Sequence, residues 1–327
     1  MFLFISCAQK SIEPSGKING LSFVSINKLV AQEDIDPMKS VNANWVSVIP
    51  FSFIPAKDNP NLRYNSDWQW IGERLDGSQK YIQQMHKAGL KVMLKPQIWV
   101  GRGVFTGFIE MNNEDDWLVF EEKYQEFILE FAKMAEEEQV EMICLGTELN
   151  RFVVTRDRFW KGMIAEVKKV YSGKLTYAEN WDCFDQVTFW SNLDYIGVDA
   201  YFPITQKEEP TKTDLIAGWS AHVAKMDSIS AKYDTPLLFT EYGYRSTVNC
   251  SMKPWDYSKK AEISEDCQVR ALSVLFDVMW SKENFAGGFL WKWFPDHKDA
   301  GGPKNDMFTV QNKKAETLVK EVYLRYN

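Results

Sequence analysis

The chain has 327 residues, of which 45% are hydrophobic and 25% are charged, so it holds enough apolar material for a folded core and is not predominantly disordered. Its 38 Lys and Arg stand against 45 Asp and Glu, a formal net charge of −7, and an acidic chain without a basic run is a poor match for the phosphate backbone of a nucleic acid. No apolar stretch reaches the roughly 20 residues that span a membrane, and the unusual count is 13 Trp, which fill a core or form flat platforms for ring-shaped ligands.

The first 17 residues are predicted to lie outside the folded domain. Residues 1–7 are an apolar run that ends in Ser6 and Cys7, which resembles the end of a bacterial lipoprotein signal with lipidation at Cys7. The run lacks a basic start and is shorter than the usual ~7–15 apolar residues, which an upstream start codon explains. Residues 9–17 are mostly polar and are interpreted as a tether. We therefore expect an exported protein, anchored only by lipid in the bacterial cell envelope, at the periplasm or outer membrane; the alternative is a buried N-terminal strand.

Short apolar runs alternate with helical patterns along the rest of the chain. Strands are expected at 18–25, 44–50, 90–95, 140–145, 174–178, 193–198, 237–240 and 287–291, and helices at 77–88, 116–138, 157–170, 215–233, 263–280 and 313–326. Such alternation favours parallel pairing, and eight units predict an α/β fold, a single (β/α)8 (TIM) barrel over residues 18–327. A doubly wound open sheet is the alternative, but no Gly-rich turn follows the first strand.

The remaining cysteines do not predict a metal site. No pair has CxxC spacing and the chain has three His, so neither a zinc site nor another metal or cofactor site is predicted. Cys144 lies in an apolar run and is interpreted as a core residue. Cys250 and Cys267 flank a polar loop and are a candidate disulfide if the protein is exported.

The active site of a barrel enzyme lies at the carboxyl ends of its strands. Glu148 and Glu241 each follow an apolar strand directly, and 241 − 148 = 93 residues separate them, so they come from different strands and are expected to face each other across the barrel mouth. The alternative is that each caps the barrel in a salt bridge. Candidate cationic partners are Lys95, Lys292 and Arg245.

Paired carboxylates suit the hydrolysis of glycosidic bonds. One group must be protonated to release the leaving sugar oxygen, and the other must be ionised to meet the positive charge that develops at the anomeric carbon. Two neighbouring carboxylates push their pKa values apart, which supplies one acid and one base. Carboxyl groups ~5–5.5 Å apart indicate retention of configuration, and ~6.5–9.5 Å indicates inversion.

At these residues the chain resembles the clan A glycoside hydrolases, (β/α)8 enzymes with glutamates after strands four and seven, and within that clan it most resembles glycoside hydrolase family 113. The resemblance is carried by INGLSF (18–23), LGTEL (145–149), DYIGVDAYFP (194–203) and PLLFTEYGYR (236–245). Characterised members of the family are largely β-1,4-mannanases. The resemblance implies a retaining mechanism with Glu148 as acid/base, Glu241 as nucleophile and a hydrogen bond from Tyr201 to the nucleophile.

One position departs from the wider clan. Most members have Asn before the acid/base, where it binds the sugar 2-hydroxyl, whereas this chain has Thr147, as in the family 113 pattern. Asn180, after the fifth strand, is the candidate replacement. Tyr244 and Arg245 follow the nucleophile strand and are candidate substrate-binding residues, with pairing to a site carboxylate as the alternative for Arg245.

Several Trp residues follow the predicted strands. Trp293 ends the eighth strand, where related barrels place a platform beneath the reacting sugar, so we expect it to be that platform, with rim packing as the alternative. Trp291 is expected in the core, one layer lower on the same face. Trp99 and Trp181 either line outer subsites or belong to the core.

The sequence therefore predicts a retaining endo-β-1,4-mannanase, or a retaining hydrolase of another β-glycan. An inactive glycan-binding surface lipoprotein is the alternative from another class, and it would keep the aromatic platforms without needing both glutamates. The expected partner is a polysaccharide or oligosaccharide, β-mannan above all. We expect a monomer with no nucleic-acid partner and no membrane contact except through the lipid.

Overall fold

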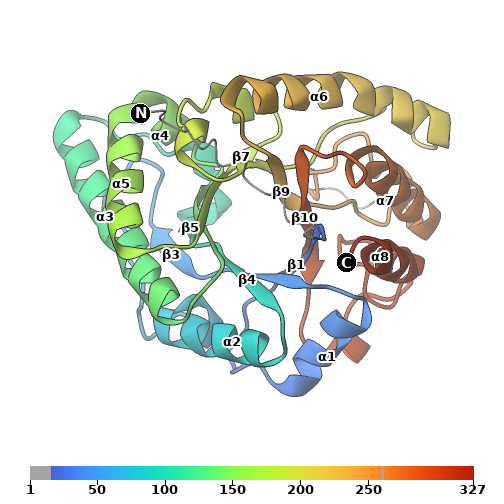
Figure 1. Cartoon of the computed structure of the whole chain (residues 1–327), viewed down its shortest axis with the longest axis horizontal. Helices are drawn as coiled ribbons and strands as arrows, with labels where there is room; N and C mark the ends of the chain where they lie inside the picture. The colour runs from blue at the N-terminus through green and yellow to red at the C-terminus, as the bar shows by residue number, and fades with distance from the viewer. Residues whose placement is uncertain (1–15, 259–260) are drawn as a thin grey trace, which may run out of the picture.

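The computed structural model describes residues 16–258 and 261–327. Eight parallel strands form a closed barrel in the order β1-β10-β9-β8-β7-β6-β4-β2, and Figure 1 shows them ringed by helices. The barrel strands are β1 (Ile18–Phe23), β2 (Trp45–Val48), β4 (Lys91–Leu94), β6 (Met142–Thr147), β7 (Lys174–Asn180), β8 (Ile196–Asp199), β9 (Leu237–Tyr242) and β10 (Phe285–Trp293). All eight predicted strands are present, so the predicted (β/α)8 barrel is confirmed.

The helices cover the outside of the barrel (Figure 1). They are α1 (Gln32–Ser40), α2 (Leu75–Lys87), α3 (Glu114–Glu137), α4 (Asn150–Thr155), α5 (Asp157–Val170), α6 (Lys212–Tyr233), α7 (Glu265–Met279) and α8 (Lys314–Arg325). Helix α3 shows why these segments are helical. Its N-cap Asn113 accepts a hydrogen bond from the Asp116 backbone, and its apolar residues recur at steps of three and four, so that one face is buried.

The core has two layers. A small cluster fills the barrel itself and consists of Ile18, Met93, Met142, Cys144, Ala178, Leu238 and Phe289. A larger cluster lies between the strands and the helices and includes the aromatic side chains of α3, such as Phe120, Phe127 and Phe131. Successive residues of a strand point to opposite faces, so β1, β4, β6, β7, β9 and β10 contribute side chains to both layers. Cys144 is a buried core residue, as predicted.

A second, two-stranded sheet extends one side of the barrel. Strands β3 (Phe51–Ile54) and β5 (Gln97–Val100) are parallel and follow β2 and β4 after Pro50 and Pro96. Val48 pairs with Leu94 and Phe51 with Gln97, and both pairs are separated by 46 residues (94 − 48 and 97 − 51), so the register is unchanged. Backbone bonds from Lys95 to Val48 and from Gln97 to Pro50, each 2.9 Å, continue across the break. This sheet was not predicted.

Helix α1 was also not predicted. It is nine residues long and contains Pro37, which removes a backbone donor and usually marks the end of a helix. Its first turn carries Glu33 and Asp34, and the Asp34 carboxylate accepts a 2.9 Å hydrogen bond from the Ala31 backbone. Acidic groups at the helix N-terminus and the buried side chains of Ile35 and Met38 therefore support a short helix despite the proline.

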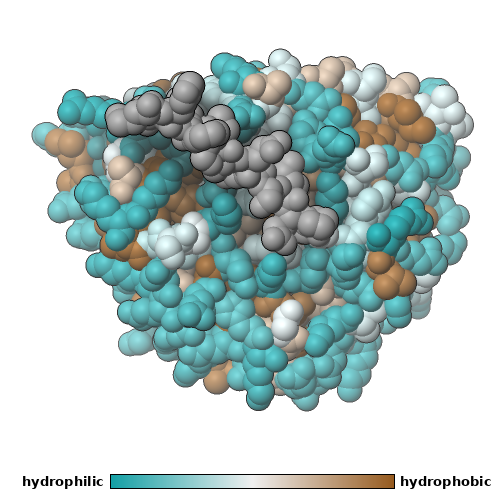
Figure 2. All heavy atoms as spheres, viewed as in Figure 1, coloured by the Kyte–Doolittle hydropathy of each residue, from teal (hydrophilic) through white to brown (hydrophobic). Residues whose placement is uncertain are grey.

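The predicted tether meets the fold at its last residue. The Lys17 backbone donates a 2.9 Å hydrogen bond to the carbonyl of Tyr326, so the folded domain begins no later than Lys17, one residue before the predicted boundary. Cys7 and the rest of the predicted signal and tether up to residue 15 lie outside the described residues. Across the part of the chain that the structure covers, no helix has the length and apolarity to cross a membrane. The face drawn in Figure 2 is mainly hydrophilic, with small apolar groups between the polar side chains.

Candidate active site

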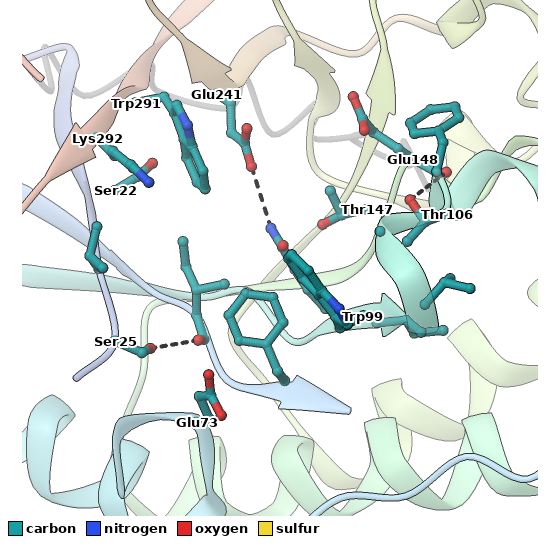
Figure 3. Close-up of a pocket in the computed structure, with 18 of the residues that line it drawn as sticks. Ser22, Ser25, Glu73, Trp99, Thr106, Thr147, Glu148, Glu241, Trp291 and Lys292 are labelled. Carbon is teal, nitrogen blue, oxygen red and sulfur yellow. Dashed lines mark hydrogen bonds between the residues drawn. The ribbon is translucent and has the colours of Figure 1, made fainter. Parts of the chain in front are cut away.

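Glu148 and Glu241 line one cavity at the carboxyl ends of the strands. Glu148 follows β6 and Glu241 lies near the end of β9. The cavity has a volume of about 430 Å³. Figure 3 shows both carboxylates along one side of it, with Trp99 and Glu73 across from them. The two glutamates predicted from different strands therefore line the same cavity.

Three neighbours donate hydrogen bonds to the Glu241 carboxylate. The Tyr201 hydroxyl donates to Oε2 at 2.9 Å. Lys95 Nζ and Gln97 Nε2 donate to Oε1 at 2.5 and 3.3 Å. The side chain is therefore held at both oxygens. Tyr201 occupies the position that the family resemblance implies for it.

Lys95 joins Glu241 to a second buried carboxyl group, Asp199. Its ammonium lies 3.3 Å from Asp199 Oδ1, and the Thr240 hydroxyl donates to the same oxygen at 2.7 Å. Burial alone would lower the pKa of Lys95, but Asp199 and Glu241 raise it above its ordinary value, so Lys95 stays charged. Burial and the nearby Glu241 raise the pKa of Asp199 to about 7. Glu241 therefore forms a salt bridge with Lys95, which the sequence analysis gave as the alternative to a catalytic role. Glu241 also lines the cavity.

Glu148 has a different environment. Burial, followed by the charges of Asp199 and Glu241, raises the pKa of its carboxyl group well above the ordinary value, against the opposing effect of Lys95. This environment favours the protonated form of Glu148, which is the form that a general acid requires. Its backbone has a φ of 52°, in the left-handed region, and its N–H donates a 2.8 Å hydrogen bond to the carbonyl of Ala178.

Aromatic residues form much of the cavity wall. Trp99 is 53% exposed and lines the cavity, so it is available as a platform for a sugar ring. Trp291 is half-buried and also lines the cavity, beside Glu241 in Figure 3. The ammonium of Lys292 lies 5.6 Å from the centre of the Trp291 ring. Trp ring faces beside polar groups match the apolar faces and polar rims of sugars.

The structure reverses the predicted roles of Trp291 and Trp293. Trp293 has no exposed surface and does not line the cavity; it packs against His297 with the ring centres 5.4 Å apart. The reason is an irregularity in β10. Leu21 pairs with Leu290, but Phe23 pairs with Trp293, so β10 contains one extra residue, which breaks the alternation of faces on which the prediction relied.

Tyr244 and Arg245 do not line the cavity, contrary to their prediction as substrate-binding residues. Tyr244 is fully buried, and its backbone carbonyl accepts a 2.8 Å hydrogen bond from Gln268 on α7. Arg245 is 6% exposed and pairs with Asp306 at 2.5 Å. The chain has turned away from the barrel axis after β9 ends, which a count of residues beyond the strand does not reveal.

Asn180 and Trp181 are not part of the cavity lining. The Asn180 side-chain oxygen accepts a 2.9 Å hydrogen bond from the Trp181 backbone. The Trp181 ring stacks on Trp255, with ring centres 5.2 Å apart. The lining instead includes Thr147, whose side-chain oxygen is buried without a hydrogen-bond partner among the described residues.

Sequence reasoning missed a group of cavity residues that come from the second sheet and from loops. They are Phe51, Trp70, Glu73, Phe105, Thr106 and Tyr257. Only Phe51 had a usable signal, because it follows Pro50 in the same register as Gln97 follows Pro96. The others depend on the path of loops, which a single sequence does not show.

The family model of glycoside hydrolase family 113 matches residues 25–313. The chain belongs to glycoside hydrolase family 113. The predicted family is thereby confirmed, and this family 113 hydrolase places its two candidate catalytic glutamates in the cavity described above. A search of individually curated proteins gave no match.

Solved structures share the fold of this family 113 protein. A GH113 β-1,4-mannanase in a complex is 24% identical with a TM-score of 0.82, covering 94% of this chain and 99% of the other. The GH113 β-mannanase AaManA from Alicyclobacillus acidocaldarius, in complex with ManMIm, is 24% identical with a TM-score of 0.83 and coverages of 95% and 98%. A β-glucuronidase from Ruminococcus gnavus is 15% identical with a TM-score of 0.64, covering 95% of this chain and 50% of the other.

Proposed function

We propose that this glycoside hydrolase is a retaining endo-β-1,4-mannanase in which Glu148 is the acid/base and Glu241 the nucleophile. The observation that supports it most directly is the contrast between the two carboxyl groups in one cavity. Glu148 has a strongly raised pKa, whereas Glu241 accepts hydrogen bonds from Lys95 and Tyr201. One group is thus suited to donate a proton and the other to attack as an anion.

In the first step, Glu241 attacks the anomeric carbon while Glu148 transfers its proton to the glycosidic oxygen. The C–O bond to the leaving sugar breaks, and a glycosyl–enzyme ester forms at Glu241. The Lys95 ammonium and the Tyr201 hydroxyl keep the carboxylate oriented toward the sugar. In the second step, Glu148, now ionised, takes a proton from water, which attacks the same carbon and releases the sugar with its configuration retained.

The substrate assignment rests on the family and on the cavity wall. The two GH113 structures described above are named as β-mannanases. Trp99 and Trp291 provide ring platforms on this cavity. For the sugar 2-hydroxyl, we propose Thr147 in place of Asn180, because the Thr147 side-chain oxygen is unpaired in the cavity wall and Asn180 is not part of that wall.

The experiment that tests the function is product formation from mannohexaose, cellohexaose and xylohexaose by the wild type and by Glu241→Ala. We expect cleavage of mannohexaose, its loss in the variant, and the β-anomer as the first product in proton NMR. Internal cleavage is checked by a fall in the viscosity of mannan that precedes the release of reducing ends. Cleavage of a different oligomer would change the substrate, and initial release of the α-anomer would reject the retaining mechanism.

The second candidate is a glycan-binding protein without catalysis. The exposed Trp68, Trp70 and Trp99 would serve such a protein equally well. It would show binding of an oligomer with no cleavage in the same assay. The joint presence of both glutamates in the cavity favours the hydrolase.

We also propose export and lipid anchoring at Cys7. The support is the apolar run that precedes Cys7 and the polar residues that follow it. Labelling of cells with a fatty-acid analogue should mark the wild type and not Cys7→Ser. Equal labelling of both proteins would reject Cys7 as the modified residue.

A further inference from the structure

We infer that Tyr177 and Glu179, two buried residues of β7, are positioning residues that hold the proton donor Glu148 through its backbone. The inference rests on the proposed function, because it assigns a task to residues behind the proposed acid/base. Neither residue lines the cavity, and both are fully buried. They therefore act on the reaction without touching the substrate.

A chain of hydrogen bonds connects the two residues to the segment that follows Glu148. The Leu149 backbone N–H donates to the Tyr177 hydroxyl at 2.8 Å. The Tyr177 hydroxyl donates to Glu179 Oε2 at 3.0 Å. The Asn180 backbone N–H donates to Glu179 Oε1 at 2.9 Å, which fixes the carboxyl group to its own strand.

Glu148 needs such support because its backbone is in the left-handed region, which costs free energy for any residue with a side chain. Strand β7 holds it on both sides. The Glu148 N–H donates to the Ala178 carbonyl at 2.8 Å, and the next N–H, that of Leu149, donates to Tyr177. These two bonds flank the Cα atom of Glu148, so they fix the direction in which its side chain leaves the backbone.

Among the residues that the structure describes, no buried cation pairs with Glu179, whereas Lys95 pairs with Glu241. Burial raises the pKa of its carboxyl group to about 8, so it is uncharged at neutral pH. An uncharged carboxyl group adds no negative charge near Glu148, yet it still makes the hydrogen bonds with Tyr177 and Asn180. Glutamine has the same shape and no charge, and its amide oxygen can still accept from the Asn180 N–H. Its NH2 group cannot accept from Tyr177, but it can donate to the Tyr177 hydroxyl oxygen, so Glu179→Gln should still hold that hydroxyl in place.

A residue that acts through the proton donor affects some substrates more than others. An oligosaccharide releases a poor leaving group and needs the proton, whereas dinitrophenolate leaves without one. A small displacement of the general acid should therefore slow the cleavage of the oligosaccharide and leave that of the dinitrophenyl glycoside unchanged. General acid catalysis raises the rate roughly 10²–10⁴-fold, and misplacement of a catalytic group lowers it on the order of 10²-fold. A residue that only supports the core would slow both reactions together.

The experiment measures kcat/KM, which reports the first bond-breaking step, on mannohexaose and on dinitrophenyl β-mannobioside. The variants are Tyr177→Phe, Glu179→Ala and Glu179→Gln. The matched control is Tyr171→Phe, which removes another buried tyrosine hydroxyl, one that donates to the Val140 carbonyl at 2.7 Å away from the site. Tyr177→Phe removes only the hydroxyl group and keeps the ring, so we expect the variant to fold. Circular dichroism checks that it does.

We expect Tyr177→Phe and Glu179→Ala to lower kcat/KM on mannohexaose by roughly 10- to 100-fold and to change the dinitrophenyl reaction by less than about threefold. Glu179→Gln should remain near wild type on both substrates, and Tyr171→Phe should show no difference between them. Equal losses on both substrates in Tyr177→Phe would overturn the inference. A wild type that cleaves neither substrate would instead reject the proposed function, so the two failures are distinct.

Discussion

The buried Glu179 predicts an unusual dependence of stability on pH. Its pKa is raised from 4.5 to about 8 by burial. Between these two values the folded protein keeps a proton that the unfolded chain has released. The unfolded state then binds fewer protons, so the free energy of unfolding falls as the pH rises. Glu179→Gln removes this titration, because glutamine binds no proton in either state.

The size of the effect follows from the difference of about 3.5 between the two pKa values. Each tenfold change in proton affinity is worth about 1.4 kcal/mol, so the full effect is about 5 kcal/mol, of which about 3.5 kcal/mol falls between pH 5 and pH 8. Burial also raises the pKa of Asp199 and Glu148, which adds a dependence of the same sign. The contribution of Asp199 and Glu148 is present in the wild type and in Glu179→Gln, so it largely cancels when their free energies of unfolding are subtracted.

The assay is urea unfolding followed by tryptophan fluorescence at pH 5, 6.5 and 8. We expect the stability of Glu179→Gln relative to the wild type to increase steadily with pH across this range. The control is Glu137→Gln, the same change of residue at an exposed position of α3. Constant stability differences between Glu179→Gln and the wild type at all three pH values would refute the reasoning, because they would mean that folding leaves proton binding at Glu179 unchanged.

Three further predictions concern the site and its surroundings. Lys95→Met removes the buried cation between two carboxyl groups and should lower the free energy of unfolding by about 3–5 kcal/mol in urea; an unchanged unfolding midpoint would contradict it. Trp291→Ala should raise KM for mannohexaose, whereas Trp293→Ala should cost about 3–5 kcal/mol of stability with KM unchanged; the reverse pattern would restore Trp293 as the platform. Cys250 and Cys267, whose sulfur atoms lie 2.7 Å apart, should resist alkylation until reduced in exported protein, and reduction should cost about 3 kcal/mol; immediate alkylation would contradict the disulfide.

The barrel was predictable because its strands are short apolar runs separated by amphipathic helices, a local pattern that one sequence displays. The pattern fails where a proline interrupts it. Pro37 lies within α1, and Pro50 and Pro96 separate β3 and β5 from the barrel strands before them. Each proline removes a backbone donor and suggests an end, although the structure continues past it.

Glu148 and Glu241 could be found because each lies at the carboxyl end of its strand, so the barrel topology alone brings them into one cavity. The exchange of Trp291 and Trp293 could not be foreseen, because one extra residue in β10 alters which side chains face the cavity. Tyr177 was not predicted to serve the site, because its connection to the acid/base passes through a backbone amide rather than through a side chain.

The sheet formed by β3 and β5 makes the two sides of the cavity unequal. On the side of β3 and β5, the sheet continues the hydrogen-bonded register of β2 and β4. This register fixes the position of Trp99, two residues after Gln97 in β5. Another part of the lining is Tyr257, which is 69% exposed and belongs to the connection between β9 and α7. An insertion in the sheet would shift every pairing beyond it, whereas an insertion in the connection would not. Descendants of this protein that acquire new glycan preferences should therefore vary in length on the connection side and keep the strand side unaltered.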